Sequence, residues 1–428
     1  MAPGTNSLRL PGEHFAAALA YLLAGGIGMA IVAPELAAGT FLSTRVAGVT
    51  HLFTLGWLTT TIFGALYQLL PVALGAPVRW ERLGHVSFAC HAPGVALFVA
   101  GIITSSTMLH HVGIGLITAG IILVILNVGF TLPTSTARDV TWWAVVAALT
   151  ALASTLVLGI MLLHNLHTGF LREERIVVLA VHLHIALIGW ALVMIVGMGH
   201  RLLPMFLLAH RADTKWTGRA LALLPAGLPL LAAGLLLHQA VVAWLGAALL
   251  EAGVICFLVQ ARLFYKARIR PRLDVGLRFT RASLLFIALG ALLAPAVLAI
   301  GGSRQPRLAT TYLIVGLLGG IVLFVVGQFY KIVPFLAWIS RYRGKVGREK
   351  VPSVAELYSA RVAEWQLFVM TTSVVAIALG VVLGNALLVR LAALGFTVGV
   401  LIFAYQLIGV AGSRVVKAPE IPPIPTGG

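Results

Sequence analysis

Charged residues are scarce in this sequence, and acidic residues are the scarcest. Only 10% of the 428 residues are Asp, Glu, Lys or Arg, against roughly 25% in a typical soluble domain. Hydrophobic residues make up 60% of the chain, and the mean hydropathy is +1.01. A soluble fold has too little interior to bury so much apolar surface. The composition therefore predicts an integral membrane protein in contact with lipid.

Cysteine is almost absent, and the basic excess has no nucleic-acid pattern. Cys90 and Cys256 both lie inside apolar runs, which argues against a disulfide framework or a cysteine zinc site. The net charge is +17, but the basic residues sit in short loops between apolar runs. Such loops meet anionic lipid and fix membrane orientation, so we expect no nucleic-acid partner. The first apolar run lacks a convincing cleavage site, and we expect it to remain as a membrane span.

Twelve apolar runs follow one another along the chain, each with the roughly 20 residues that a bilayer crossing needs. They lie near residues 14–35, 46–74, 83–106, 109–131, 142–166, 177–206, 217–238, 240–264, 279–300, 310–338, 362–384 and 387–411. We therefore expect an all-α integral membrane protein, a single polytopic domain of about twelve transmembrane helices (1–428). An even number of crossings puts both termini on one side.

Basic residues are unevenly divided between the two faces of this predicted bundle. The face of the termini carries 24 of the 30 Lys and Arg residues. The opposite face carries only Arg45, Arg172, Arg175, Arg304, Arg307 and Arg390. Cytoplasmic loops are enriched in Lys and Arg, so we expect both termini to be cytoplasmic, in a bacterial inner membrane.

The second and sixth spans share a pattern at an offset of 133 residues. The matching pairs are His51/His184, Gly56/Gly189, Trp57/Trp190, Gly64/Gly197, Leu69/Leu202, Leu70/Leu203 and Pro71/Pro204. The tenth span follows at an offset of 263 from the second, where Gly319, Gly327, Tyr330 and Pro334 stand opposite Gly56, Gly64, Tyr67 and Pro71. Related helices four spans apart predict three pseudo-symmetric four-helix repeats, roughly 14–131, 142–264 and 279–411, around a pseudo-threefold axis.

Histidine is abundant, with 13 residues against 13 acids. Seven fall in the membrane half opposite the termini, on four spans: His51, His110, His111, His164, His167, His182 and His184. An imidazole in hydrocarbon is costly unless it is bonded, and neutral imidazole is the commonest nitrogen ligand of haem iron, copper and zinc. An interfacial hydrogen bond explains any one of these residues alone. Convergence of four helices at one depth favours a metal or haem site.

Spacing limits which of these histidines can act together. His164 and His167 are three residues apart and share a helical face. His182 and His184 lie about 200° apart around a helix, so only one of them faces a small site unless the helix is irregular. We take His164, His167 and His182 as candidate metal ligands. Glu251, the one carboxylate well inside a span, is either a proton-path residue or a paired group, and the sequence does not separate these.

A family resemblance rests on His51 and the run Gly64–Pro71, which reads GALYQLLP. A histidine near the periplasmic end, followed by a Gly-Ala-Tyr-Tyr-Leu-Pro-like turn, resembles the second helix of haem-copper oxidase subunit I, especially in its nitric oxide reductase branch. The short chain is similar to the NnrS family of haem- and copper-containing membrane proteins linked to nitric oxide. The resemblance implies haem b, with copper as a second candidate, and a cytochrome or quinol as redox partner.

The resemblance carries over only in part. It makes His51 the second-helix ligand of a low-spin haem and puts His184 or His182 in the place of the sixth-helix copper ligand. The seventh-helix histidine pair is missing, since that span holds only His238, and Ile314 stands where the tenth helix would carry a histidine. These departures argue against full reduction of oxygen or nitric oxide. The second haem ligand stays open among His110, His111, His164, His167, His182 and His184.

We therefore expect a haem-binding membrane protein in respiratory electron transfer or nitric oxide handling, oxidoreductase-like at most. Two other classes stay open: a transporter or metal permease lined by histidines, and an accessory subunit that carries pigment or haem inside a larger membrane complex. An absorbance spectrum of the purified protein distinguishes the first reading from the transporter.

Overall fold

The computed structural model of the protein describes residues 8–209, 213–269, 271–301 and 304–412. These residues form helices joined by short turns, and they contain no strand. Twelve of the helical segments within them are long and apolar enough to cross a membrane. This confirms the all-α membrane fold of about twelve spans that the apolar runs predict.

Nine of the spans are essentially single helices, and three are composite. The single ones are α1 (Arg9–Ile31), α5 (Glu81–Thr104), α6 (Thr107–Thr131), α7 (Val140–Thr168), α10 (Lys215–Leu236), α11 (Ala240–Lys266), α12 (Val275–Ile300), α15 (Ala360–Leu383) and α16 (Ala386–Ala411). The short helices between spans are α2 (Ala33–Ala38), η2 (Leu132–Thr134), η3 (Arg172–Glu174), η6 (Arg343–Lys345) and η7 (Val354–Leu357).

The three composite spans are the second, sixth and tenth, and each contains a π-helical segment between two α-helices. They consist of α3 (Thr44–His51), η1 (Leu52–Thr59) and α4 (Thr60–Leu74); of α8 (Arg175–His184), η4 (Ile185–Leu192) and α9 (Val193–Leu207); and of α13 (Pro306–Ile314), η5 (Val315–Val322) and α14 (Leu323–Tyr342). All three π-helical segments are eight residues long and start at offsets of 133 and 263 from the first. Helix of this kind is rare and often marks functional sites.

A glycine at an equivalent position of each composite span allows that span to pack closely against the first helix of its own four-helix group. The groups are Arg9–Thr134, Val140–Lys266 and Val275–Ala411. At the position shared by the three groups, an added Cβ would lie 2.7 Å from the Cβ of His14 for Gly64, 2.2 Å from the Cβ of Ala144 for Gly197, and 2.6 Å from the carbonyl oxygen of Gly276 for Gly327. No side chain fits at these separations, so glycine is required for the observed approach of the two helices.

A buried amide side chain on the fourth helix of each group holds the start of the third helix. It accepts a backbone N–H and donates to a backbone carbonyl: Asn127 bonds both groups of Trp80, Gln260 bonds Thr217 N and Asp213 O, and Gln406 bonds both groups of Ser359. These backbone groups stand at the start of a helix, where few N–H groups have a partner in the helix, and the amide adds to the backbone bonds that Trp80 O, Thr217 N and Ser359 O already make. The same bonding solution therefore recurs in all three groups.

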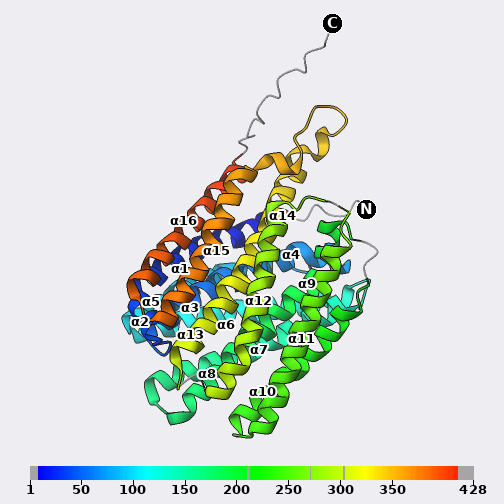
Figure 1. Cartoon of the computed structure of the whole chain (residues 1–428). Helices are drawn as coiled ribbons and strands as arrows, with labels where there is room; N and C mark the ends of the chain where they lie inside the picture. Colours follow the sequence, from blue (N-terminus) through cyan, green and yellow to red (C-terminus); the bar gives the residue numbers. More distant parts are fainter. Residues whose placement is uncertain (1–7, 210–212, 270, 302–303, 413–428) are drawn as a thin grey trace.

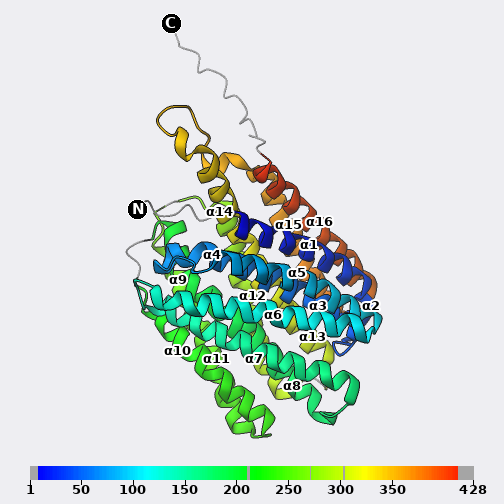
Figure 2. The same ribbon diagram turned by 180° about the vertical axis from the view of Figure 1, so that it is seen from behind.

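The second and tenth spans lie inside the bundle, whereas only 39% of the most apolar stretch of the sixth span is buried. In the most apolar stretch of the second and tenth spans, 72% and 83% of the residues are buried. By contrast, Val241, Leu285 and Leu292 on outer helices are 83%, 70% and 77% exposed, as expected of side chains that face lipid. Figure 1 shows the second and third groups around α14, and Figure 2 shows α1, α4, α5 and α6 of the first group side by side.

The first prediction concerns orientation. We call the face at which α1 begins the terminal face; the chain ends themselves lie outside the described residues. The charge asymmetry predicts that Arg268 and Arg343 are cytoplasmic and that Glu173 is periplasmic. In a chain whose two native cysteines are replaced, a membrane-impermeant thiol reagent added to intact cells should label Glu173→Cys and spare Arg268→Cys. The reverse labelling would invert the orientation.

The second prediction concerns the buried amides. Replacing Gln260 with leucine removes the side-chain partner of Asp213 O and one of the two acceptors of Thr217 N, which keeps Thr214 O. We expect Gln260→Leu to lower the free energy of unfolding by roughly 1–2 kcal/mol, measured as a reduced melting temperature in detergent. Gln239→Leu, at an exposed position in the turn before α11, is the matched control and should leave the melting temperature unchanged. Equal melting of the two variants would contradict a stabilising role for the amide.

Candidate functional site

Three histidines from two helices meet at the face opposite the terminal face. His110 and His111 lie in the first turn of α6, and His167 lies in the last turn of α7. Ser106 precedes α6 and accepts the backbone N–H of Leu109, while Gly169, with φ of +65°, ends α7. The turn chemistry at both ends therefore sets the height at which the three imidazoles meet.

One ligand atom from each of these histidines lies within 4.8 Å of the other two. The Nε2 atoms of His110 and His167 are 2.7 Å apart, so one donates a hydrogen bond to the other. The Nδ1 of His111 donates to the carbonyl of Thr107 at 2.7 Å, which leaves its Nε2 as the free lone pair. His110 is buried, and the other two are exposed. We call this set the histidine trio.

The trio has the donor set of a metal site with an open position. Imidazole nitrogen suits copper, zinc, iron and nickel. Two nitrogens bound to one tetrahedral ion at about 2.0–2.1 Å lie about 3.3 Å apart. The 2.7 Å separation must therefore widen slightly, and the exposed His167 ring is free to do so. In the described part of the chain, three ligand atoms make up this group. A tetrahedral ion bound by all three would keep its fourth position for water or another small ligand.

A larger cavity lies between the groups, on the same side of the membrane. Its volume is about 300 Å³, and residues from seven spans form its wall. The wall is mostly apolar, but it includes His51 on α3 and His182 on α8. His182 lies within electrostatic range of His51, and its Nδ1 is buried with no hydrogen-bond partner. The exposed Arg175 also lines this cavity and marks its mouth.

A short hydrogen bond fixes the tautomer of His51. Its Nδ1 donates to the carbonyl of Ala47 at 2.7 Å, and His184 makes the same bond to Ala180 at 2.8 Å. Both residues end the α-helix that precedes a π-helical segment. In a neutral imidazole with Nδ1–H engaged, Nε2 is the acceptor. His51 therefore offers Nε2 to any electrophile, such as a metal ion, that enters the cavity.

The trio and the cavity are neighbours. Ile114, one helical turn after His110, lines the cavity, and so does Leu166, which precedes His167. A metal held by the trio and a group held in the cavity would thus be separated by only one layer of side chains.

The predicted site residues divide into separate locations. His110, His111 and His167 come together, and His51 shares the cavity with His182. His164 is exposed beside Phe170 and is not in the trio. The ring of His184 stacks on Tyr312 of α13, with 6.2 Å between centroids, and it is not among the cavity-lining residues. His182 and His184 therefore face different neighbours, as their predicted separation of about 200° around the helix requires.

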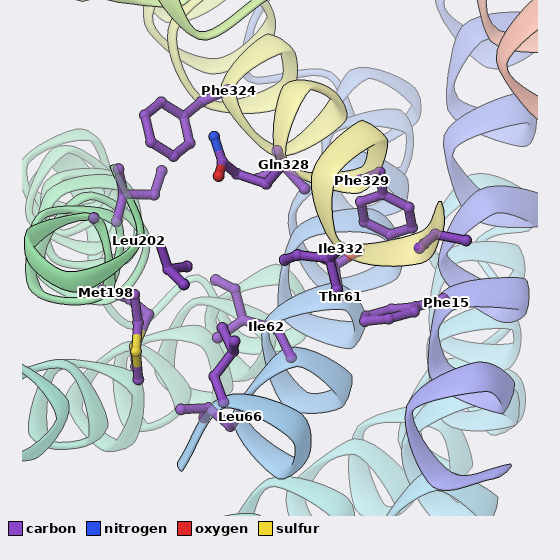
Figure 3. A pocket seen from close by; sticks show the side chains of 17 residues that line it. Phe15, Thr61, Ile62, Leu66, Met198, Leu202, Phe324, Gln328, Phe329 and Ile332 are labelled. Atoms are coloured by element: carbon purple, nitrogen blue, oxygen red, sulfur yellow. The ribbon is translucent and has the colours of Figure 1, made fainter. Parts of the chain in front are cut away.

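A second, smaller cavity lies on the terminal side of the π-helical segments. Its volume is about 80 Å³, and side chains from α1, α4, α9 and α14 converge on it (Figure 3). Phe15, Leu66, Met198 and Phe324 are typical of its wall, and Thr61 and Gln328 are its polar members. The Gln328 amide donates to the Thr280 hydroxyl. This space is mostly apolar, and no histidine lines it.

Sequence reasoning missed two polar groups at the large cavity. Arg175 was counted only as a loop charge, and Thr155, whose hydroxyl is buried without a partner, lies in the apolar fifth span. No pattern in the sequence distinguishes these two residues from lipid-facing or loop residues.

Comparison with known protein families found no family model that matches this chain, and no curated protein matches it.

The third prediction concerns metal binding by the trio. We expect the purified protein to bind one Cu²⁺ or Zn²⁺ at this site, and His167→Ala to weaken that binding by at least about tenfold because it removes one of three ligands. His164→Ala, one turn away on the same helix, is the matched control and should bind like the parent. Titration calorimetry with chelator-stripped protein measures both. A loss of binding in the control alone would move the site to His164.

Proposed function

We propose that this multi-pass membrane protein binds haem in its large cavity and copper at the histidine trio, and serves in electron transfer or nitric oxide handling. The observation that carries the proposal is the pair His51 and His182. Two imidazoles on different spans line the wall of the same, otherwise mostly apolar cavity. Haem b is the cofactor that the family resemblance of the second span implies.

The residues present fit a haem group. His51 offers Nε2 from a ring oriented by Ala47, an arrangement that raises ligand basicity and fixes the ring plane. His182 comes from the sixth span with a nitrogen that has no protein partner. The apolar wall suits a macrocycle, and the guanidinium of Arg175 at the mouth suits a propionate. The volume falls within the range of about 300–1,000 Å³ for cofactor sites.

Bound haem supplies reversible one-electron exchange and a site for diatomic gases. The chain's own residues supply the rest. The imidazoles orient the group, the apolar wall excludes water, and Arg175 offsets the charge of an anionic substituent. The trio stands one side-chain layer away, at the exposed edge, where a soluble cytochrome would reach it. A quinol in the membrane is the other donor consistent with a lipid-embedded cavity.

The ligand set favours electron transfer over full reduction of oxygen. Ile314 stands at the position equivalent to His51 and His184, and it lines the cavity as an apolar residue. The tenth span therefore contributes no imidazole at that position. A site with two imidazoles from the second and sixth spans is complete for one six-coordinate haem and has no histidine left from the tenth.

A transporter is the second candidate, and one observation favours it. The cavity lies among seven spans and opens beside an exposed arginine, as a path for a small anion or a metal ion would. An accessory role, in which a larger complex covers the lipid-facing helices, is the third. The absorbance spectrum separates the haem protein from the transporter because only a haem protein has a Soret band that shifts on reduction.

The fourth prediction concerns haem. Protein expressed with ample haem should carry haem b with reducible Soret and alpha bands. Loss of one axial imidazole should empty the site or convert a six-coordinate spectrum to a five-coordinate one, so we expect this change in His51→Ala and in His182→Ala. His184→Ala is the matched control and should keep the parent spectrum. It removes the pseudo-equivalent ring from outside the cavity.

Two outcomes would overturn this assignment. If His51→Ala keeps the haem content and spectrum of the parent, His51 is not a ligand. If the wild-type protein is colourless after expression with haem, the haem reading fails and the transporter reading replaces it.

A further inference from the structure

Six side chains in the described part of the first group have a buried polar atom with no partner, and three of them belong to titratable residues. These three are His14 on α1, Tyr67 on α4 and His91 on α5, each at most 3% exposed. The unpartnered atoms are Nε2 of His14, Oη of Tyr67 and Nδ1 of His91. None of these residues lines the large cavity. Buried polar atoms are nearly always bonded, so three in one place require an explanation.

The hydrogen bonds of the two histidines show what the unpartnered nitrogens are. Nδ1 of His14 donates to the carbonyl of Leu10 at 2.7 Å, and Nε2 of His91 donates to the carbonyl of Leu55 at 3.2 Å. A carbonyl accepts only from N–H, so the other nitrogen of each neutral ring is a bare acceptor. Such an acceptor needs a water molecule or a proton.

These groups form a series from the terminal face into the interior of the bundle. At the terminal face, His85 Nδ1 is 2.6 Å from the carboxylate of Glu13, the residue next to His14. The rings of His14 and Tyr67 follow, with centroids 5.7 Å apart, and His14 lies within electrostatic range of both His85 and His91. His91 is deeper in α5, about two helical turns beyond His85.

The series ends at the wall of the large cavity. The Leu55 carbonyl that accepts from His91 belongs to the π-helical segment η1, and Leu55 lines the cavity together with His51. Small polar groups flank the series: the side chains of Ser87 and Asn127 lie near the Tyr67 hydroxyl without a hydrogen bond of normal geometry. Phe88 and Phe63 pack against the two imidazoles and exclude lipid.

The equivalent tyrosine in the third group is different. Tyr330, at an offset of 263 from Tyr67, donates its hydroxyl hydrogen to Gln366. The positions equivalent to His14 in the glycine contacts are Ala144 and Gly276. In the second group His200 stands at the Tyr67 position, and its Nδ1 is also buried without a partner. The combination with His14 belongs to the first group, so the four-helix fold does not require the full series.

We propose that His14, Tyr67 and His91, bridged by water, carry protons between the Glu13–His85 pair at the terminal face and the large cavity. The Nε2 of His14 and the Nδ1 of His91 each accept a proton from one water and release it to the next. The Tyr67 hydroxyl accepts on its oxygen while it donates its own hydrogen. Glu13 on α1 and His85 on α5 are titratable groups at the terminal end of the series, and the Tyr21 hydroxyl on α1 bonds the carbonyl of Ala92 beside His91.

The test is proton flux into liposomes that contain the full-length protein. A potassium diffusion potential set with valinomycin drives protons, and an internal pH dye reports them. Wild-type protein should conduct above empty liposomes. Tyr67→Phe, which removes only the hydroxyl, and His91→Gln, which keeps a donor for Leu55 but cannot take a proton, should each reduce the flux by at least about tenfold. Tyr330→Phe is the matched control and should conduct like the parent.

Wild-type flux equal to that of empty liposomes would overturn the proposal, and so would unchanged flux in both variants. If the variants do not fold, as judged by their elution and melting, the wild-type protein still decides. A density map that resolves water should show ordered water at all three unpartnered atoms, and dry atoms would refute the path. The flux needs no haem. A colourless protein that conducts keeps this proposal and removes the haem function, and the reverse result does the opposite.

Discussion

The structure depends on one constraint, which is that a polar backbone group inside a membrane must find its partner within the protein. The π-helical segments of the second, sixth and tenth spans break the regular α-helical pattern at the centre of the bundle. Side chains satisfy the carbonyls that this leaves available. The Leu55 carbonyl, for example, accepts from the Thr60 hydroxyl at 3.0 Å and from His91. Each such bond also fixes which nitrogen of a histidine stays available, so the same interaction stabilises the fold and prepares the chemistry.

The remainder of the bundle holds these irregular spans in place. Glycines at equivalent positions allow each composite span to approach the first helix of its group closely, and in membranes such approach supplies the packing that water would otherwise drive. Buried amides on α6, α11 and α16 fix the height at which the third helix of each group begins. Both devices are rigid. The large cavity can therefore persist between groups without collapse of the surrounding helices.

The spans and the repeat offset were accessible from sequence because they are one-dimensional signals. An apolar run of about 20 residues has few alternatives to a membrane helix, and shared glycines keep their spacing when helices keep their packing. The partners within the site were not accessible. Choosing His167 over His164 requires the rotation of α7 against α6, and choosing His182 over His184 requires the phase of α8 at the start of a π-helical segment. The amide contacts of Asn127 are likewise long-range and have no local sequence signal.

Function in this fold arises where the groups differ and not where they agree. Glycines, π-helical segments and buried amides recur in all three groups and have structural explanations. No imidazole position recurs in all three groups: His51 and His184 have Ile314 as their counterpart, and the His14 position is alanine or glycine in the other groups. A polar group in hydrocarbon is costly, so selection that favoured stability alone would remove these histidines. Their presence in a repeated scaffold that does not require them, with buried unpartnered nitrogens on His14, His91 and His182, is what assigns chemistry to these parts of the bundle.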